Sequence, residues 1–531
     1  MKAAWWRGAA GWRGGVLAAA WLGVCAGTAG AETLTVLATT DVHGSIRRTP
    51  GVYAEHNGGS LLACASIVEK ERRASENPPL LVDCGDIFQG TEESWGTGGL
   101  AMAALYNAMG YDAFVPGNHD FDGGMETLDA FLRAMRAVPL AANLVLDAGA
   151  GEGLRRVAPY VIRETGGMRV AIVGLTTPNI PNWYPPGWLR GAHFTGARRA
   201  LEAVMPKVNA ENPDLRILLV HQGLMHGGDD AANEVGEICS TFREFDLVLG
   251  GHLHWLVEGT RVAGTPYAQA GSGAEGVLRV DLEYDRKRGE VAAVKSRFVR
   301  VEADTPEDPA LAELVREATE AADARLGEVL TTTEKRVAPG EGLGGVSAMQ
   351  TLLAEAFREA CGADIALHGV LSRHAIGPGE VTVADAWRAV PFENGIYVVR
   401  LTGREIREAL EESARYAGTA RQFAAAGLRY TIDPDAPPGR RISRVRLRDG
   451  SKLHGKKRYT VALNSYHLSS GGGRFPGLTA AANAPLARKR RVGSARELLV
   501  DYLRAHRPLA VEVPGDVSVV RGAVREREPY R

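Results

Sequence analysis

The sequence predicts an α/β protein in which a layered α/β domain is followed by an α+β domain. Short apolar segments bounded by Gly, Asp or His recur through the first half, amphipathic stretches separate them, and a new series of strands and helices begins near residue 333. In the first half we expect strands at Leu34–Ala38, Leu80–Val82, Val170–Leu175, Ile217–Val220 and Leu247–Leu249, and helices at Ser60–Arg73 and Gly123–Met135.

Residues 1–31 have the pattern of a secretory signal peptide. A positively charged start precedes the apolar stretch Val16 to Ala26, and small residues allow cleavage after Ala31. The apolar stretch is shorter than the ~20 residues that span a bilayer; a short membrane anchor is the alternative interpretation. The sequence therefore predicts a periplasmic or secreted protein with no stable membrane insertion after signal cleavage.

The layered domain is expected to cover residues 32–304, and a linker, residues 305–332, follows it. Helical spacing continues to Gly327 without an earlier glycine, which predicts one interdomain helix; an ordinary surface helix of the first domain is equally compatible. The face of this helix would contain Leu311, Leu314, Val315, Ala318 and Ala322. Residues 333–531 would form the second domain, with helices at Ser347–Ala360 and Gly403–Tyr416 and strands at Ile396–Leu401, Arg441–Leu447 and Tyr459–Leu463.

Charge and cysteine content exclude two classes of protein. The chain has 62 Lys and Arg against 63 Asp and Glu, a net charge of −1, which argues against a nucleic acid polymer as partner because such binders carry a basic excess. The cysteines beyond the signal are scattered without CxxC spacing, and they are too few to form a disulfide scaffold for this length.

Five polar motifs follow the predicted strands of the first domain. They are Asp41-Val42-His43, Gly85-Asp86, Gly117-Asn118-His119-Asp120, His221-Gln222-Gly223 and Gly250-Gly251-His252-Leu253-His254. Each motif alone is a common loop or turn pattern. Because the carboxyl ends of strands in an open α/β sheet converge on one crevice, we expect seven side chains to meet, namely Asp41, His43, Asp86, Asn118, His221, His252 and His254.

Imidazoles mixed with hard oxygen donors suit Mn, Zn, Fe or Co better than a structural zinc site. Seven ligands exceed the needs of one open catalytic metal, so the set predicts two divalent ions that share a carboxylate. Two such ions clamp a phosphate and supply hydroxide for in-line attack. His119 is expected at the edge of the site, where it stabilises phosphate oxygens or protonates the leaving oxygen. Asp122 would orient that imidazole, or alternatively cap the next helix.

In this order the motifs resemble those of the calcineurin-like metallophosphoesterases. The chain after residue 31 resembles their two-domain periplasmic branch, the 5′-nucleotidase and 2′,3′-cyclic-nucleotide phosphodiesterase family. The resemblance implies a four-layered α/β/β/α metallophosphoesterase domain and a 5′-nucleotidase-type C-terminal substrate domain. It also implies one ion on Asp41, His43, Asp86 and His254, a second on Asp86, Asn118, His221 and His252, and a catalytic dyad of His119 and Asp122.

Motifs in the second domain resemble the nucleotide-binding half of that family. Pro391-Phe392-Glu393-Asn394 with Leu401-Thr402-Gly403 resembles its PFxN…LTG signature, which makes Asn394 a candidate for substrate binding. Ser470 to Phe475 resembles the loop that carries one aromatic of a base clamp. The resemblance thus implies base stacking on Phe475 and on Phe423, with core packing as the alternative for each. It also places Arg373 near the phosphate, although His368–Arg373 departs from the family's NGGGIR in sequence and spacing.

The expected function is an exported phosphohydrolase of nucleotides that uses two divalent metal ions, Mn, Zn, Co or Fe. Residues 177–183, with the pattern TPxIxxW, resemble the 2′,3′-cyclic-nucleotide 2′-phosphodiesterase/3′-nucleotidase branch. Asp122 is more typical of 5′-nucleotidases, which are the first alternative. A thiosulfohydrolase on the same scaffold and a non-catalytic nucleotide-binding protein are the others; the complete ligand set argues against the last.

Overall fold

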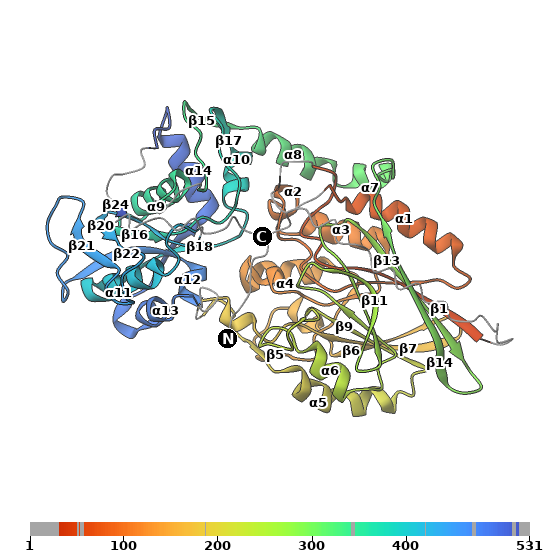
Figure 1. The fold of residues 1–531 in the computed structure, drawn as a ribbon. Helices are drawn as coiled ribbons and strands as arrows, with labels where there is room; N and C mark the ends of the chain where they lie inside the picture. Colours follow the sequence, from red (N-terminus) through yellow and green to blue (C-terminus); the bar gives the residue numbers. More distant parts are fainter. Residues whose placement is uncertain are drawn as a thin grey trace.

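The computed structural model of the chain describes residues 31–49, 53, 58–185, 187–340, 346–419, 421–469, 474–511 and 517–519. The predicted signal peptide, apart from Ala31, and residues 470–473 of the predicted base-clamp loop lie outside these described residues. Figure 1 shows the two halves of the chain as two bodies, the first coloured red to green and the second green to blue.

The first domain contains two six-stranded sheets. One has the order β14-β13-β1-β2-β3-β4, and the other has the order β11-β12-β10-β9-β7-β6. The strands of the first sheet are β1 (Ala31–Thr39), β2 (Leu80–Asp83), β3 (Ala113–Phe114), β4 (Val138–Pro139), β13 (Gly276–Asp285) and β14 (Glu290–Arg300). Those of the second are β6 (Tyr160–Thr165), β7 (Met168–Leu175), β9 (Leu215–Val220), β10 (Leu247–Gly250), β11 (Leu256–Val262) and β12 (Thr265–Ala270).

Apolar side chains from both sheets form one buried core, including Val36, Val82, Ile172, Ile217 and Leu249. Alternate residues of the same strands point outward and pack beneath helices. Helices α1 (Leu61–Ala74), α3 (Leu100–Met109) and α4 (Gly124–Ala134) cover the first sheet, and α5 (Ala197–Ala210) and α6 (Val235–Thr241) cover the second. The layers are therefore α/β/β/α, and the predicted fold class is confirmed.

Parallel pairing places the ends of the central strands side by side. β1, β2 and β3 run parallel, with Thr39 opposite Asp83 and Asp83 opposite Phe114. In the second sheet β7, β9 and β10 also run parallel. The loops that follow these strands therefore leave the same edge of each sheet, which brings the five polar motifs to one end of the domain.

The predicted single helix of the linker is wrong, because the structure has two shorter helices, α7 (Pro309–Leu314) and α8 (Arg316–Leu326). Asp308 caps the first through the amides of Ala310 and Leu311, and the backbone departs from helical geometry at Val315. This break changes the predicted face, since Val315 is buried while 52% of Leu314 is exposed. Ala318 packs on the core of the first domain and Leu326 belongs to a core of the second, and Figure 1 shows α8 crossing between them.

The second domain is built on a five-stranded sheet with the order β19-β16-β22-β18-β23. Its strands are β16 (Ile365–His368), β18 (Gly395–Thr402), β19 (Ala424–Ala426), β22 (Arg458–Asn464) and β23 (Arg490–Ser494). One face packs on α9 (Ala348–Cys361), α10 (Val383–Ala389) and α14 (Ala495–Ala505), and the other on α11 (Gly403–Ala414), α12 (Ser465–Ser469) and α13 (Pro476–Asn483). Smaller sheets join β15 (Val329–Thr333) with β17 (Gly379–Thr382), and β20 (Leu428–Ile432) with β21 (Ile442–Leu447) and β24 (Val517–Val519).

Two further findings concern the whole described chain. Among the described residues, no helix has the length and apolar character needed to cross a membrane. The thiols of Cys64, Cys84, Cys239 and Cys361 are free and buried, so no disulfide joins residues within the described part of the chain.

Candidate active site

Two groups of potential metal ligands share the carboxylate of Asp86. In one group, Asp41, His43, Asp86 and His254 each offer a ligand atom within 4.8 Å of the others; in the second, Asp86, His221 and His252 do the same. Asn118 adjoins the second group, since its Oδ1 lies 3.1 Å from His221 Nε2. All seven side chains that the motifs single out therefore come together at the edge of the two sheets.

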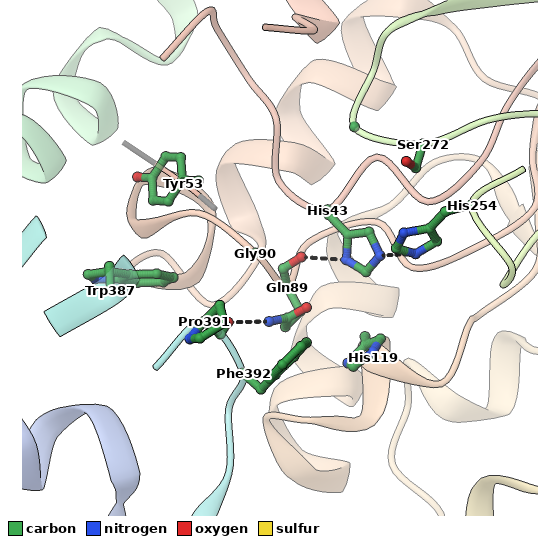
Figure 2. Close-up of a pocket in the computed structure, with 11 residues that line it drawn as sticks. His43, Tyr53, Gln89, Gly90, His119, His254, Ser272, Trp387, Pro391 and Phe392 are labelled. Atoms are coloured by element: carbon green, nitrogen blue, oxygen red, sulfur yellow. Dashed lines mark hydrogen bonds between the residues drawn. The ribbon is translucent and has the colours of Figure 1, made fainter. Parts of the chain in front are cut away.

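The geometry around Asp86 fits a bound cation. Asp86 Oδ2 is buried and accepts no hydrogen bond, although it lies 3.2 Å from His221 Nε2 and 3.9 Å from His43 Nε2. The Nε2 atoms of His43 and His254 face each other at 3.0 Å, as Figure 2 shows. A buried carboxylate oxygen without a hydrogen bond is costly, and a cation among these nitrogens and oxygens would satisfy it.

Backbone carbonyls fix the orientation of two of the imidazoles. His43 Nδ1 donates to the carbonyl oxygen of Gln89 at 2.9 Å, and His221 Nδ1 donates to that of Cys84 at 2.6 Å. With Nδ1 used in this way, Nε2 of each ring is the atom that points into the cluster. Such hydrogen bonds are typical of metal-binding histidines, because they set the tautomer and the ring orientation.

The backbone of the ligand-carrying loops is strained at five of the candidate ligand residues. Asp41, His43, Asp86, His252 and His254 all have positive φ, between 50° and 70°. This left-handed region is unfavourable for residues other than glycine, and it persists where the surrounding structure enforces it, often at functional sites. Here the enforcement comes from backbone hydrogen bonds between the loops, such as those from the amides of Asp41 and His43 to the carbonyls of Gly85 and Asp86.

Asp120 is a residue whose importance the motif analysis missed. Its buried carboxylate accepts hydrogen bonds from the backbone amides of Asp86, Ile87 and Gly117, at 2.8–3.1 Å. It therefore joins the loop of Asp86 to the loop of Asn118 and His119. The sequence places it next to His119, but only the fold reveals that its carboxylate holds two loops together.

Burial and mutual charge shift the pKa values of the cluster in opposite directions. Burial lowers the pKa of His252 to about 3, and burial raises the pKa of Asp41. Burial is the largest influence on the pKa of Asp86 and raises it, but the neighbouring His221, His119 and His43 together outweigh burial and lower the pKa well below its ordinary value. Large perturbations of this kind, caused by desolvation and by named charge partners, are typical of functional sites.

A histidine–carboxylate pair lies beside the metal ligands. His119 Nδ1 donates to Asp122 Oδ2 at 2.8 Å, and the backbone amide of His119 donates to Asp86 Oδ1 at 2.7 Å. The ring of His119 lies 5.4 Å from that of His43. With Nδ1 engaged by Asp122, the ring of His119 lies at the edge of the cluster and lines the pocket described next.

A pocket between the two domains opens onto this cluster. The first domain contributes His43, His119, His254, Gln89 and Tyr53 among other residues, and the second contributes Trp387, Pro391 and Phe392. Its empty volume is about 610 Å³, which includes the part open to solvent. Figure 2 shows Phe392 beside His119, and Gln89 Nε2 donates to the carbonyl of Pro391 at 3.3 Å.

The substrate candidates of the second domain do not line this pocket as the structure stands. Phe423 and Phe475 are each only 1% exposed, and their ring centroids lie 4.3 Å apart in the core. Arg373 is exposed in the segment after β16. Asn394 accepts a hydrogen bond from the hydroxyl of Ser465 at 3.2 Å, and its carbonyl accepts one from the amide of Ala495.

Comparison with known proteins agrees with the fold and the donor set. Residues 34–256 match the family model for calcineurin-like phosphoesterases, and residues 328–480 match the model for the 5′-nucleotidase C-terminal domain. The chain thus combines a calcineurin-like phosphoesterase domain with a 5′-nucleotidase C-terminal domain, and the resemblance of its motifs is confirmed. Calcineurin-like phosphoesterases use divalent metals, for which the cluster around Asp86 supplies candidate ligands.

Individual relatives share both halves of the chain. It is 28% identical over 500 residues to the trifunctional nucleotide phosphoesterase protein YfkN of Bacillus subtilis, an alignment that covers 85% of this chain and 32% of that protein. It is 27% identical over 533 residues to a 5′-nucleotidase of Vibrio parahaemolyticus, covering 90% of each. In fold it matches the crystal structure of a putative 5′-nucleotidase from Staphylococcus aureus with a TM-score of 0.77 at 22% identity, over 92% of this chain and 100% of that one.

Proposed function

We propose that the protein is an exported phosphohydrolase of nucleotides that uses two divalent metal ions, Mn, Zn, Co or Fe. The observation that carries this proposal is the pair of ligand groups that share Asp86, with the His119–Asp122 pair directly beside them. When bound, such ions would supply positive charge for the phosphate and lower the pKa of a water molecule. Asp41, His43, Asp86 and His254 would hold one ion, and Asp86, Asn118, His221 and His252 the other.

His119 and Asp122 would form the catalytic dyad. The hydrogen bond from Nδ1 to Asp122 fixes the orientation of the His119 ring at the edge of the pocket, with Nε2 on the opposite side of the ring from Asp122. From there Nε2 would donate to a phosphate oxygen, or would transfer its proton to the ribose oxygen that leaves. A mobile proton matters most for a ribose leaving group, because an alkoxide is a poor leaving group.

The nucleoside would extend from the metal ligands toward the second domain. The interdomain pocket leads from His43 and His119 to Phe392, and Asn394 and Arg373 belong to segments that the family resemblance associates with the substrate. Stacking of a base between Phe423 and Phe475 requires these rings, now in contact, to move apart. Base stacking on aromatic rings is worth ~1–3 kcal/mol per base.

Within the nucleotidases we favour a 2′,3′-cyclic-nucleotide 2′-phosphodiesterase with 3′-nucleotidase activity. The support is the segment Thr177 to Trp183, whose last ring lies 5.3 Å from the ring of His252 and thus borders the cluster. A 5′-nucleotidase is the second candidate, supported by the direct hydrogen bond between His119 and Asp122, a residue more typical of that branch.

A substrate panel tests the proposal. Protein stripped of metal and reloaded with Mn, Zn or Co would be assayed on 2′,3′-cyclic, 3′- and 5′-nucleotides, with a thiosulfate conjugate as a further arm. Preference for the cyclic and 3′ substrates supports the first candidate, and preference for 5′ substrates supports the second. Release of sulfate alone, or no metal-dependent turnover of any ester, would overturn the nucleotidase proposal. Export would be tested by fractionation and by mass spectrometry of the mature N-terminus, expected at Glu32.

A further inference from the structure

The segment that follows β7 packs against the pair His119 and Asp122. It contains a tyrosine, Tyr184, to which the proposed function assigns no role. This segment includes the short helix η3 (Ile180–Asn182) and then Trp183 and Tyr184. The hydroxyl oxygen of Tyr184 lies 2.5 Å from Asp122 Oδ1 and 2.6 Å from the carbonyl oxygen of Asn118. Both partners are acceptors and the phenol has one proton, so the hydroxyl shares that proton between Asp122 and the backbone carbonyl of Asn118.

Asp122 is therefore held at both ends of its carboxylate. Oδ2 accepts from His119 Nδ1 at 2.8 Å, while Oδ1 accepts from Tyr184. The side chain of Asp122 is 11% exposed, so solvent has little access to replace the tyrosine. A carboxylate with both oxygens engaged cannot rotate freely, and its orientation sets the direction of the imidazole that donates to it.

The ring of Tyr184 is itself fixed by its surroundings. It is stacked on Trp188, with the two planes within 3° of parallel, and Trp188 Nε1 donates to the carbonyl of Phe121 at 2.9 Å. Burial, reinforced by the charge of Asp122, raises the pKa of Tyr184 well above its ordinary value. The phenol therefore keeps its proton near neutral pH and remains a donor.

We propose that Tyr184 is a positioning residue of the reaction, which fixes the carboxylate of Asp122 and thereby aims Nε2 of His119 at the leaving oxygen of the substrate. The inference rests on the proposed function insofar as His119 is the group that meets the substrate. In this proposal the aromatic segment after β7 takes part in the chemistry by positioning Asp122, and does more than pack over the loop.

The first test replaces Tyr184 by Phe, which keeps the ring on Trp188 and removes only the hydroxyl. Loss of a hydrogen bond to a charged group predicts a fall in kcat of about tenfold to a hundredfold on the best nucleotide substrate, with KM within about twofold. The fall is smaller with p-nitrophenyl phosphate, whose leaving group needs no proton. The matched control is Tyr284→Phe, because the hydroxyl of Tyr284 also lies near a carboxylate, 3.4 Å from Asp214, on β13 away from the site.

A double-mutant cycle separates positioning from loop stability. In an Asp122→Asn background, Tyr184→Phe is expected to reduce kcat by less than about twofold, because the carboxylate through which it acts is gone. Two independent losses that multiply would overturn the proposal. So would an equal loss of kcat with nucleotide and with p-nitrophenyl phosphate, since a loop that merely loosens affects both.

A readout without turnover distinguishes this inference from the proposed function. Nuclear magnetic resonance of zinc-loaded protein with ¹⁵N-labelled histidine, recorded at a pH high enough for the ring of His119 to be neutral, reports the His119 tautomer, expected as a single Nδ1–H form in the wild type and in Tyr284→Phe. Tyr184→Phe is expected to give a mixture. If that mixture appears although no phosphate ester is hydrolysed, positioning stands and the proposed function fails. If His119 keeps a single tautomer in Tyr184→Phe, the positioning role is refuted whatever the enzyme hydrolyses.

Discussion

The candidate metal-ligand cluster around Asp86 in the first domain and the aromatic cluster of Phe423 and Phe475 in the second differ in the kind of group that they bury. Around Asp86, buried polar groups converge and Asp86 Oδ2 accepts no hydrogen bond. Around Phe423 and Phe475, two large rings pack against each other and against His467. The first cluster is costly to maintain unless a ligand binds there, whereas the packed rings of the second need no ligand, although His467 Nδ1 beside them has no hydrogen-bond partner among the described residues. A function is therefore easier to infer for a site where burying polar groups lowers stability than for one where burying apolar rings raises it.

The backbone shows the same contrast. The loop positions of Asp41, His43 and Asp86 have positive φ, a conformation that costs of order 1–3 kcal/mol for a residue other than glycine. Phe423 precedes the short strand β19, and Phe475 precedes α13, both without such strain. The backbone is therefore strained at the metal-ligand cluster and has no positive φ at the two phenylalanines of the aromatic cluster. Three variants and one chelation experiment test this contrast, given from the largest expected effect to the smallest.

The largest effect is expected from Asp86→Asn. Because Asp86 belongs to both ligand groups, the variant is expected to bind fewer than two metal ions and to lose at least about a thousandfold in kcat/KM. Metal content by mass spectrometry and nucleotide hydrolysis measure both. The matched control is Glu283→Gln, which removes a carboxylate paired with Lys295 on the surface. A folded Asp86→Asn protein with full activity would contradict the shared ligand.

Asp120→Ala is expected to destabilise the loops that carry the ligands of the same cluster. It leaves the amides of Asp86, Ile87 and Gly117 without their acceptor, at a cost of about 1–3 kcal/mol for an unsatisfied buried group. Calorimetry should show a lower Tm for the first domain and weaker metal affinity. An unchanged Tm would mean that the two loops are held together by other contacts.

Chelation of metal tests whether the cluster is stabilised by a ligand. A cation at about 100 times its Kd stabilises the folded state by about 2.7 kcal/mol, so a chelator is expected to lower the Tm of the wild type and reloading to restore it. Asp86→Asn should respond much less. Equal responses of the two proteins would show that the cation acts elsewhere.

Phe475→Leu tests whether the aromatic cluster stacks on the base, and it is expected to have the smallest effect of the four. Stacking would make KM for nucleotides rise by about fivefold or more, while KM for p-nitrophenyl phosphate stays unchanged. Core packing alone would lower Tm and leave both KM values as they are, because a ring buried in the core contributes only to stability. Phe423→Leu is the matched comparison, since the two rings are in contact.

The sequence by itself determined the α/β architecture and which seven polar side chains meet at the edge of the two sheets. Strands such as Leu34–Ala38 were recognisable from their apolar runs, and polar motifs at strand ends must converge because parallel strands end at one edge. Local pattern and topology are enough to place such residues, because a residue that directly follows a parallel strand lies at the shared edge of the sheet.

Only the tertiary structure decided the break of the linker helix at Val315, the loop contacts of Asp120 and the contact between Tyr184 and Asp122. It also decided that Phe423 and Phe475 lie in the core. Each of these depends on which distant side chain fills a given space or completes a given hydrogen bond. Such pairings follow from packing and from the pairing of buried polar groups, and the spacing of residues along a chain does not encode them.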